Sequence, residues 1–258
     1  HAKKYAWVHI DVQTYTKQDR LFRSMQHQKA CYERFDGIYC VSENVKEAFS
    51  AKFGLTERVH VAYNMLDEQA IRRRKNEPVD DIPKGEFLMV SVGSLIPRKG
   101  FERLIHICGL LKSRGYRFHL LILGKGELYE QLAEQVIDEH LLDSVQLLGF
   151  RDNPYPYMAA ADLYVCPSYV EGFSTVVSEA VVLETPVVTT DCSGMREILG
   201  DSEYGLITRN TEESLFEGLR TMLDKPEVYQ YYQQRVRERA PFFYMEERLK
   251  AYEEILDQ

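Results

Sequence analysis

Short continuous apolar runs alternate along the chain with longer amphipathic stretches. Continuous apolar runs are typical of strands buried on both faces, and the amphipathic stretches between them are typical of helices that cover a sheet. This order predicts an α/β fold with parallel sheets and right-handed crossovers, that is, doubly wound, Rossmann-like domains. Strands are expected at Tyr5–Ile10, Gly37–Val41, Val59–Tyr63, Phe87–Val92, Phe118–Leu123, Val145–Leu148, Leu163–Cys166 and Pro186–Thr190. Helices are expected at Lys17–Arg34, Glu43–Phe53, Phe101–Ser113, Leu128–His140, Tyr155–Ala160, Thr175–Leu183, Met195–Leu199, Glu212–Leu223, Val228–Arg239 and Tyr244–Leu256.

A polar, proline-containing stretch at residues 76–85 follows the basic run Arg72–Lys75 and divides the chain. We predict part of a Rossmann-like domain at residues 1–76, a second such domain at residues 77–240, and a helical C-terminal segment at residues 241–258. Two interpretations of Arg72–Lys75 stay open. The favoured one is a solvated cluster of linker charges, and the other is a site for an anionic lipid or polymer.

Composition narrows the function classes. The 258 residues carry a net charge of −8, which argues against general nucleic-acid binding because phosphate recognition needs a basic surface. No apolar run approaches the ~20 residues of a membrane-spanning helix. The five cysteines include no Cys-x-x-Cys pair and fit a reducing compartment, so we expect a cytoplasmic protein.

Four loops should meet at one edge of the second sheet, because ligands of doubly wound domains bind beyond the carboxyl ends of the strands. All four contain glycine, charge or both, and they are Gly93–Gly100, Gly124–Glu127, Gly149–Asp152 and Ser168–Ser174. In the first, Arg98 and Lys99 precede a helix whose dipole their charges oppose, which favours a role in binding a diphosphate. The alternative is a basic turn.

The stretch from Glu171 to Glu179 is the most informative of these segments. Glu171 belongs to a loop, and Glu179 lies about one and a half turns into the following helix. The backbone amides of Gly172–Thr175 are unpaired donors of a helix N-terminus and suit a phosphate or sugar oxygen. Each carboxylate can accept hydrogen bonds from vicinal hydroxyls, so the stretch fits a nucleotide-sugar. Taken alone, it equally fits a solvated acidic loop and a surface glutamate.

Several other motifs are missing or weak. Gly124–Glu127 begins like a dinucleotide fingerprint, but Tyr129 takes the third glycine position, so a tight turn beneath a ligand fits better. The sequence contains no P-loop, no zinc-ligand spacing and no nucleophile elbow of a hydrolase. His9 ends the first strand. It is more readily read as a partly buried structural histidine than as a proton carrier in a cleft.

In order along the chain, five segments together resemble the donor-binding half of the retaining GT-B glycosyltransferases of family four, the group one transferases. They are Gly93–Gly100, Gly124–Glu127, Leu148–Phe150, Ala161–Ser168 and Glu171–Ala180. The resemblance covers about residues 87–207, and residues 5–64 are a looser match to the second half of that family's N-terminal domain. It implies that earlier strands, which form much of the acceptor site, are missing from this sequence. A further N-terminal segment or a partner chain is then expected to cover the exposed surface.

The resemblance implies a role for each matching residue. Arg98 and Lys99 would bind the donor diphosphate and stabilise it as it leaves, and Glu171 would contact the donor sugar. Glu179 would hold the ribose hydroxyls. The catalytic set expected from the resemblance is Arg98, Lys99, Glu171 and His9, the last because the family has a histidine near the reacting centre. The donor-binding set is Gly93, Gly124, Gly126, Phe150, Arg151, Gly172, Phe173, Ser174, Thr175 and Glu179.

Two departures from the family pattern concern glycine. Ser174 stands where glycine is frequent, which would narrow the sugar pocket. Glu184 and Thr185 stand where a glycine-bearing turn usually precedes the proline, and we interpret this as a different helix end.

The resemblance implies a metal-independent, cofactor-free, retaining glycosyltransferase that uses a nucleotide-sugar, with UDP expected as the carrier. The implied acceptor is a growing bacterial glycan on a lipid or protein, which also implies a location at the inner face of the membrane and peripheral association with it. Two alternatives stay open, a GT-B nucleotide-sugar epimerase and a nucleotide-sugar-binding module without turnover. We expect these 258 residues alone to bind the donor and not to transfer the sugar.

Overall fold

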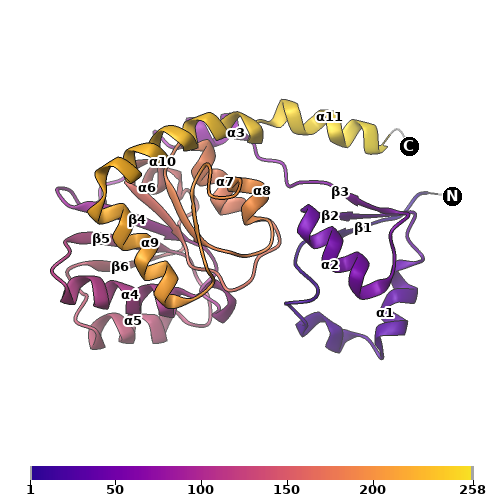
Figure 1. Cartoon of the computed structure of the whole chain (residues 1–258), viewed down its shortest axis with the longest axis horizontal. Helices are drawn as coiled ribbons and strands as arrows, with labels where there is room; N and C mark the ends of the chain where they lie inside the picture. Colours follow the sequence, from indigo (N-terminus) through magenta and orange to yellow (C-terminus); the bar gives the residue numbers. More distant parts are fainter. Residues whose placement is uncertain (1, 257–258) are drawn as a thin grey trace.

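The computed structural model describes residues 2–256, with two parallel sheets that form two lobes (Figure 1). The smaller lobe holds a sheet of order β1-β2-β3, formed by β1 (Tyr5–Val8), β2 (Gly37–Cys40) and β3 (Val59–Val61). Its helical elements are η1 (Lys17–Leu21), α1 (Met25–Tyr32) and α2 (Glu43–Phe53). Ser42 caps α2 by accepting a hydrogen bond from the Val45 amide, and Gly54 ends it in the left-handed conformation.

The larger lobe is a six-stranded parallel sheet of order β6-β5-β4-β7-β8-β9. Its strands are β4 (Phe87–Val92), β5 (Phe118–Leu123), β6 (Val145–Gly149), β7 (Leu163–Cys166), β8 (Val187–Thr190) and β9 (Leu206–Thr208). The strand order reverses between β4 and β7, which is where doubly wound sheets bind ligands. The predicted α/β fold with Rossmann-like parallel sheets is confirmed.

Helices cover both faces of the larger sheet. The helices are α3 (Glu68–Arg74), α4 (Phe101–Ser113), α5 (Tyr129–Asp138), α6 (Tyr155–Ala160), α7 (Thr175–Val182), α8 (Met195–Leu199), α9 (Glu212–Asp224) and α10 (Pro226–Arg239). One apolar core contains residues of α4, α5 and α9, and the other contains residues of α6, α7 and α8. The second core continues into the smaller lobe through β1, β2 and α2, so the two lobes share buried apolar contacts.

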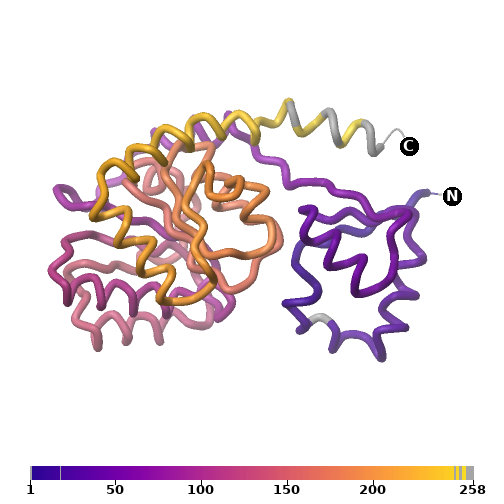
Figure 2. The backbone as a smooth tube through the Cα atoms, viewed as in Figure 1, coloured from indigo at the N-terminus to yellow at the C-terminus, as the bar shows by residue number. Residues whose placement is uncertain are grey.

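Two segments join the lobes (Figure 1). One is the chain between β3 and α3. The other is α11 (Met245–Leu256), which follows η3 (Ala240–Phe243) and extends from the larger lobe to the smaller one (Figure 2). On α11, the Tyr252 hydroxyl donates to the Tyr63 carbonyl at 2.7 Å, and its ring stacks against Trp7.

Three elements differ from the expectation. The predicted helix over Lys17–Arg34 is wrong: Phe22 is extended, and Ser24 accepts a hydrogen bond from the His27 amide as the N-cap of a separate helix. The short strand β9 was not predicted. Helix α3 was not predicted either, although Asp67 caps it by accepting from the Ala70 amide. Within α3, Arg72 contacts the Tyr244 ring and hydroxyl and Arg74 pairs with Asp152, so the basic run makes structural contacts.

Candidate functional site

The glycine-containing loops after β4, β5 and β6 pack backbone against backbone at the carboxyl edge of the larger sheet. The Gly124 amide donates to the Gly149 carbonyl at 2.9 Å, and the Gly93 amide donates to the Leu123 carbonyl at 3.0 Å. A Cβ atom at Gly124 would overlap the Gly93 carbonyl oxygen, and one at Gly126 would overlap the backbone of Leu95. The predicted glycines are therefore brought together, and a close backbone approach requires glycine at positions 124 and 126, whereas a Cβ atom at Gly93 would make only ordinary contacts.

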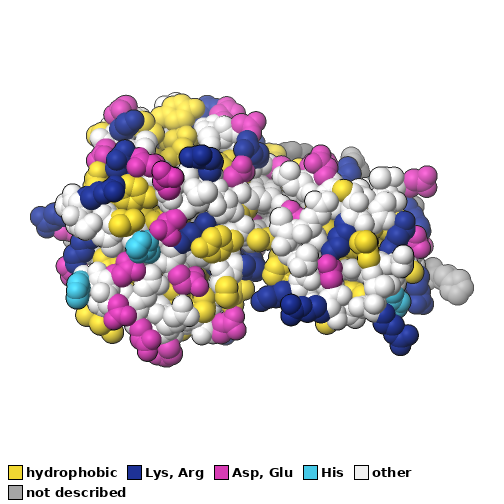
Figure 3. Space-filling view, turned by 60° about the horizontal axis from the view of Figure 1, so that its bottom comes forward, with side chains coloured by type: hydrophobic (Ala, Val, Ile, Leu, Met, Phe, Trp, Pro, Cys, Tyr) yellow, Lys and Arg dark blue, Asp and Glu magenta, His cyan; other side chains and the backbone are white. Residues whose placement is uncertain are grey.

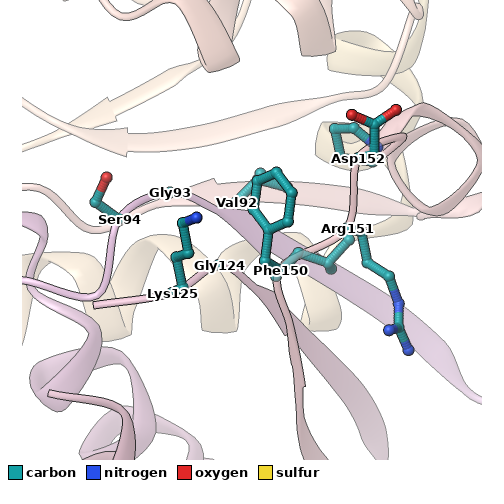
Figure 4. Close-up of a pocket in the computed structure, with 10 residues that line it drawn as sticks. Val92, Gly93, Ser94, Gly124, Lys125, Phe150, Arg151 and Asp152 are labelled. Atoms are coloured by element: carbon teal, nitrogen blue, oxygen red, sulfur yellow. The ribbon is translucent and has the colours of Figure 1, made fainter. Parts of the chain in front are cut away.

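A cavity of about 320 Å³ lies over these loops (Figure 4). The Phe150 ring, 59% exposed, forms one wall, and the Lys125 ammonium lies 4.7 Å from the centre of that ring. A largely apolar cavity with an aromatic wall and one cation at its edge suits a planar base. The Arg151 guanidinium is turned away and pairs with Asp81 at 2.8 Å, so only the rest of Arg151 lines the cavity.

The predicted charged residues form one compact cluster. The Lys99 ammonium lies 2.6 Å from Oε1 of Glu171, and the Ser168 hydroxyl donates to the same oxygen at 2.6 Å. Arg98 reaches Oε2 of Glu171 at 3.4 Å. Glu171 is buried, and two cations face one carboxylate, so the cluster carries a net positive charge. This excess can bind an anion, which would then share both cations with Glu171.

Arg103 supports the loop that carries Glu171, and the sequence analysis missed it. Its Nε donates to the Pro167 carbonyl at 2.7 Å and its Nη2 donates to the Ser168 carbonyl at 2.7 Å. The guanidinium carbon lies 3.8 Å from the centre of the Tyr169 ring. Burial lowers the pKa of Arg103. A cation on an amphipathic helix is usually solvated, so there was little reason in the sequence to expect a buried one. The one available signal was that Arg103 lies about one turn after Arg98 and Lys99.

The chain that leads into α7 offers free backbone donors. The amides of Gly172, Phe173, Ser174 and Thr175 have no hydrogen-bond acceptor within residues 2–256. Ser174 is the N-cap of α7, but its buried hydroxyl makes no capping bond. That hydroxyl has no hydrogen-bond partner among residues 2–256. The Phe173 side chain points into the core, where its ring lies 5.2 Å from that of Tyr63. Of this predicted set, the amides are available to an anion.

Glu179 lies on α7, about one turn after the free amides at the start of that helix. Its carboxylate accepts a hydrogen bond from the Tyr155 hydroxyl at 3.1 Å. Burial raises the pKa of Glu179 to about 7, and the bond from Tyr155 opposes that shift only in part. A buried carboxyl with one partner keeps acceptor positions for hydroxyls of a ligand.

His9 and the smaller lobe meet the glutamate loop at Gly172. A Cβ at Gly172 would overlap the His9 carbonyl oxygen, and the Ser42 hydroxyl donates to the Gly172 carbonyl at 3.1 Å. The His9 side chain itself is exposed. The structure thus places the backbone of His9, at the end of β1, against the loop that holds Glu171.

A second contact between the lobes involves the N-terminus of α2. The Glu197 carboxylate, on α8 of the larger lobe, accepts hydrogen bonds from the amides of Glu43 at 2.8 Å and Asn44 at 3.1 Å. Ser193 donates to Asp11 at 2.7 Å. A carboxylate at a helix N-terminus satisfies free amides and interacts favourably with the helix dipole, so this contact helps to hold the two lobes together.

Within the part of the chain that the structure describes, no three His, Cys, Asp or Glu residues are grouped so that they could hold a metal ion. A search of residues 2–256 also finds no helix with the length and apolar character needed to cross a membrane.

Solved structures of similar shape are glycosyltransferases. A TarM mutant of S. aureus, crystallised with fondaparinux, α-GlcNAc-glycerol and UDP, matches with a TM-score of 0.81 at 18% identity, over 100% of this chain and 51% of its own. HepE of Anabaena with UDP matches with a TM-score of 0.81 at 21% identity, over 98% of this chain and 71% of its own. These matches show the GT-B fold.

Curated relatives match in sequence. An N-acetylgalactosamine-N,N'-diacetylbacillosaminyl-diphospho-undecaprenol 4-alpha-N-acetylgalactosaminyltransferase of Campylobacter jejuni is 34% identical over 82% of this chain and 57% of its own length. An uncharacterised glycosyltransferase of Methanocaldococcus jannaschii is 30% identical over 66% of this chain and 44% of its own. The chain thus spans about half the length of these relatives. The model of the family "Glycosyl transferases group 1" matches residues 72–239. The chain belongs to this family of glycosyl transferases.

Proposed function

We propose that the chain forms the donor-binding part of a retaining glycosyltransferase that takes its sugar from a UDP-sugar. The observation that carries the proposal is the cluster of Arg98, Lys99 and Glu171 beside the free amides of Gly172–Thr175. Cations and amides together suit a diphosphate, and the adjacent carboxylate suits the hydroxyls of a sugar. UDP in the structures of TarM and HepE supports the choice of nucleotide.

The proposed position of the donor follows the line of these groups. The base would lie against Phe150 in the cavity above Gly93 and Gly124, and the ribose hydroxyls would donate to Glu179. The diphosphate would then reach Lys99, Arg98 and the amides of α7, and the sugar would reach Glu171. The His9 backbone already lies at Gly172, which supports a place for His9 near the reacting carbon.

The chemistry that this arrangement supports is stabilisation of the leaving diphosphate. Negative charge develops on the phosphate oxygen as its bond to the sugar breaks, and Arg98, Lys99 and the α7 amides can oppose that charge without reorganising. Three donor groups of this kind can do so without a metal ion, which is why we propose a metal-independent reaction.

For the acceptor, we propose a bacterial glycan carried on a lipid or protein. The Campylobacter relative is named for an undecaprenol-linked diphosphate acceptor, and other curated relatives are named for lipopolysaccharide core and capsular polysaccharide synthesis. No structural contact in the chain distinguishes one acceptor glycan from another, so the proposal stays at this class.

Calorimetric titration with UDP, GDP and ADP tests the donor assignment. We expect UDP to bind most tightly and Lys99→Ala to weaken it, whereas the matched surface variant Lys84→Ala should bind as the unchanged protein does. Equal affinity of both variants for UDP would contradict the proposed diphosphate site. With a UDP-sugar, release of free UDP and an epimerised sugar in the absence of acceptor would instead support the epimerase.

A further inference from the structure

The loop that carries Phe150 is bonded to the segment that joins the two lobes. The Arg151 guanidinium donates to Oδ2 of Asp81 at 2.8 Å, and the Tyr157 hydroxyl donates to Oδ1 of the same carboxylate at 2.7 Å. Asp81 lies in the joining segment between α3 and β4, and Tyr157 lies on α6, the helix that follows the loop. One carboxylate of the joining segment therefore holds the loop on both sides of its end.

A buried partner distinguishes Asp81 from the other surface carboxylates. Acidic and basic side chains are mixed over the visible face of the larger lobe, and an exposed ion pair by itself contributes little (Figure 3). Asp81 is itself exposed, but Tyr157 is buried, and its hydroxyl donates to Asp81. The hydrogen bond from Tyr157 is the main cause that lowers the pKa of Asp81, and the bond from Arg151 adds to it. Asp81 is therefore charged at neutral pH, with a donor on each of its oxygens.

The next two residues of the loop are bonded to the same part of the chain. The Arg74 guanidinium, at the end of α3, donates to Oδ2 of Asp152 at 2.8 Å and to the Asp152 carbonyl at 3.1 Å. The side-chain amide of Asn153 donates to the Arg74 carbonyl at 2.9 Å and to Glu77 at 2.8 Å. Three consecutive residues after Phe150 are thus held by α3 and by the segment that follows it.

Side chains hold this joining segment in position. Residues 79–86 form no helix or strand, and their amides donate to no backbone acceptor within residues 2–256. Val79 and Ile82 pack against the apolar core that the two lobes share, and Asp81 lies between them in the sequence. A change at Asp81 should therefore affect the joining segment and the Phe150 loop together.

We propose that Asp81 is a positioning residue of the nucleoside site. It fixes Arg151 and Tyr157, and through them the Phe150 ring on which the base lies. The pair with Asp81 also turns the Arg151 guanidinium out of the cavity, which leaves Lys125 as the cation beside the ring (Figure 4). The inference rests on the proposed position of the base at Phe150.

The proposal has a reciprocal consequence. If Asp81 and its partners favour the loop conformation that binds the base, then a bound base must favour the conformation of the joining segment by the same factor. Nucleoside binding should therefore stabilise the segment between α3 and β4, although the ligand does not contact Asp81.

Calorimetry with uridine, UDP and pyrophosphate tests the proposal. Asp81→Ala should lose roughly tenfold in affinity for uridine and for UDP, the factor that corresponds to one hydrogen bond to a charged group. Its affinity for pyrophosphate should not change, because Arg98, Lys99 and the α7 amides are untouched. Asp81→Asn keeps an acceptor oxygen for Tyr157 and should recover part of the loss. Asp80→Ala, at an exposed neighbour in the same segment, is the matched control and should bind all three ligands as the unchanged chain does.

Hydrogen exchange distinguishes positioning from a general loss of stability. UDP should slow exchange of the amides of residues 79–82 in the unchanged chain and should not do so in Asp81→Ala. Equal exchange with and without UDP in the unchanged chain would overturn the inference.

The ligands also separate this inference from the proposed function. If UDP binds the unchanged chain and Asp81→Ala binds uridine equally well, the inference is wrong and the proposed function stands. Equal losses for uridine and pyrophosphate would also overturn the inference, because they indicate a general structural role. If the unchanged chain binds GDP or ADP in place of UDP, the choice of UDP is wrong, and guanosine or adenosine then takes the place of uridine in the same comparison.

Discussion

The ammonium group of Lys99 donates to Glu171 at 2.6 Å, and both side chains are largely buried, at 13% and 7% exposed. Removing one member of a buried ion pair costs stability, because the remaining charge is left buried without a partner. A diphosphate that binds here shares Lys99 with Glu171 and does not meet a free cation. The affinity of this site for phosphate should therefore depend on whether Glu171 carries its negative charge.

Removal of the ammonium group should weaken nucleotide binding selectively. We expect Lys99→Ala to lower the affinity for UDP by about 1.5–3 kcal/mol, the size of a charge-assisted hydrogen bond. Uridine, which lacks phosphates, should bind both proteins alike. Calorimetry with the two ligands measures the difference, and an equal loss for both would show that Lys99 does not contact the phosphates.

Glu171→Gln should separate the sugar from the phosphates. The amide keeps the shape of the side chain but frees Lys99 from its charge partner, so UDP should bind at least as well as before. A UDP-sugar should bind about tenfold more weakly, because a carboxylate accepts hydroxyl bonds more strongly than an amide does. Competition between UDP and UDP-glucose on both proteins gives the ratio. A loss confined to UDP would mean that Glu171 serves the phosphates.

Glu179 should make stability depend on pH between about 4.5 and 7. Burial raises its pKa to about 7, so in this window the folded chain binds more protons than the unfolded one. The free energy of unfolding due to this group therefore falls as pH rises through about 7. Glu179→Gln should flatten that slope and gain most in stability above pH 7, while it weakens binding of the nucleotide. Urea unfolding at a series of pH values checks the slope, and identical slopes for both proteins would contradict it.

Arg103 should be both structural and functional. Arg103→Met removes the donors to the buried carbonyls of Pro167 and Ser168, and we expect a loss of roughly 2–4 kcal/mol in the free energy of unfolding. Arg103→Lys restores a charge and one donor and should recover part of it. Because the same loop carries Glu171, UDP-sugar affinity should fall more than uridine affinity in the folded Arg103→Lys protein. Unchanged stability of Arg103→Met would contradict the role of these bonds.

Glu184 has a left-handed backbone, with φ of 64°. Glu184→Gly should raise the free energy of unfolding by about 1 kcal/mol, because glycine adopts this conformation without strain. Glu184→Ala is the matched control: it also loses the ion pairs to Arg72 and Arg237, each at 3.7 Å, but keeps the strain. Thermal unfolding of the three proteins should rank glycine above glutamate and glutamate above alanine. If glycine and alanine were equal, the backbone would not be strained.

The φ of Glu184 shows that this turn keeps the left-handed conformation that glycine favours, with glutamate in its place, so the interpretation as a different helix end is wrong. Most elements of the larger lobe could be predicted because buried parallel strands and amphipathic helices leave local patterns, and Ser42 and Gly54 mark the ends of α2 in the sequence itself. Phe101–Ser113 was predicted with its observed bounds.

What the sequence did not reveal depends on distant contacts or on single residues. Ser24 divides a stretch whose polar pattern continues through it, and only its backbone conformation shows the break. Arg103 is buried by carbonyls 64 and 65 positions away in the chain, which no local pattern encodes. The backbone near Phe150 and Arg151 is the part expected to meet the base, and the sequence did not reveal that Asp81, in the polar stretch before β4, pairs with the Arg151 guanidinium.

Gly172 touches the backbone of His9 so closely that no side-chain atom fits between them. The two lobes therefore meet backbone against backbone at this point. Two cavities lie beside this contact, one lined by Phe150 and the other by Tyr169. A side chain at position 172 would overlap the backbone of His9 and Ile10, so the two lobes could not keep this contact without moving apart.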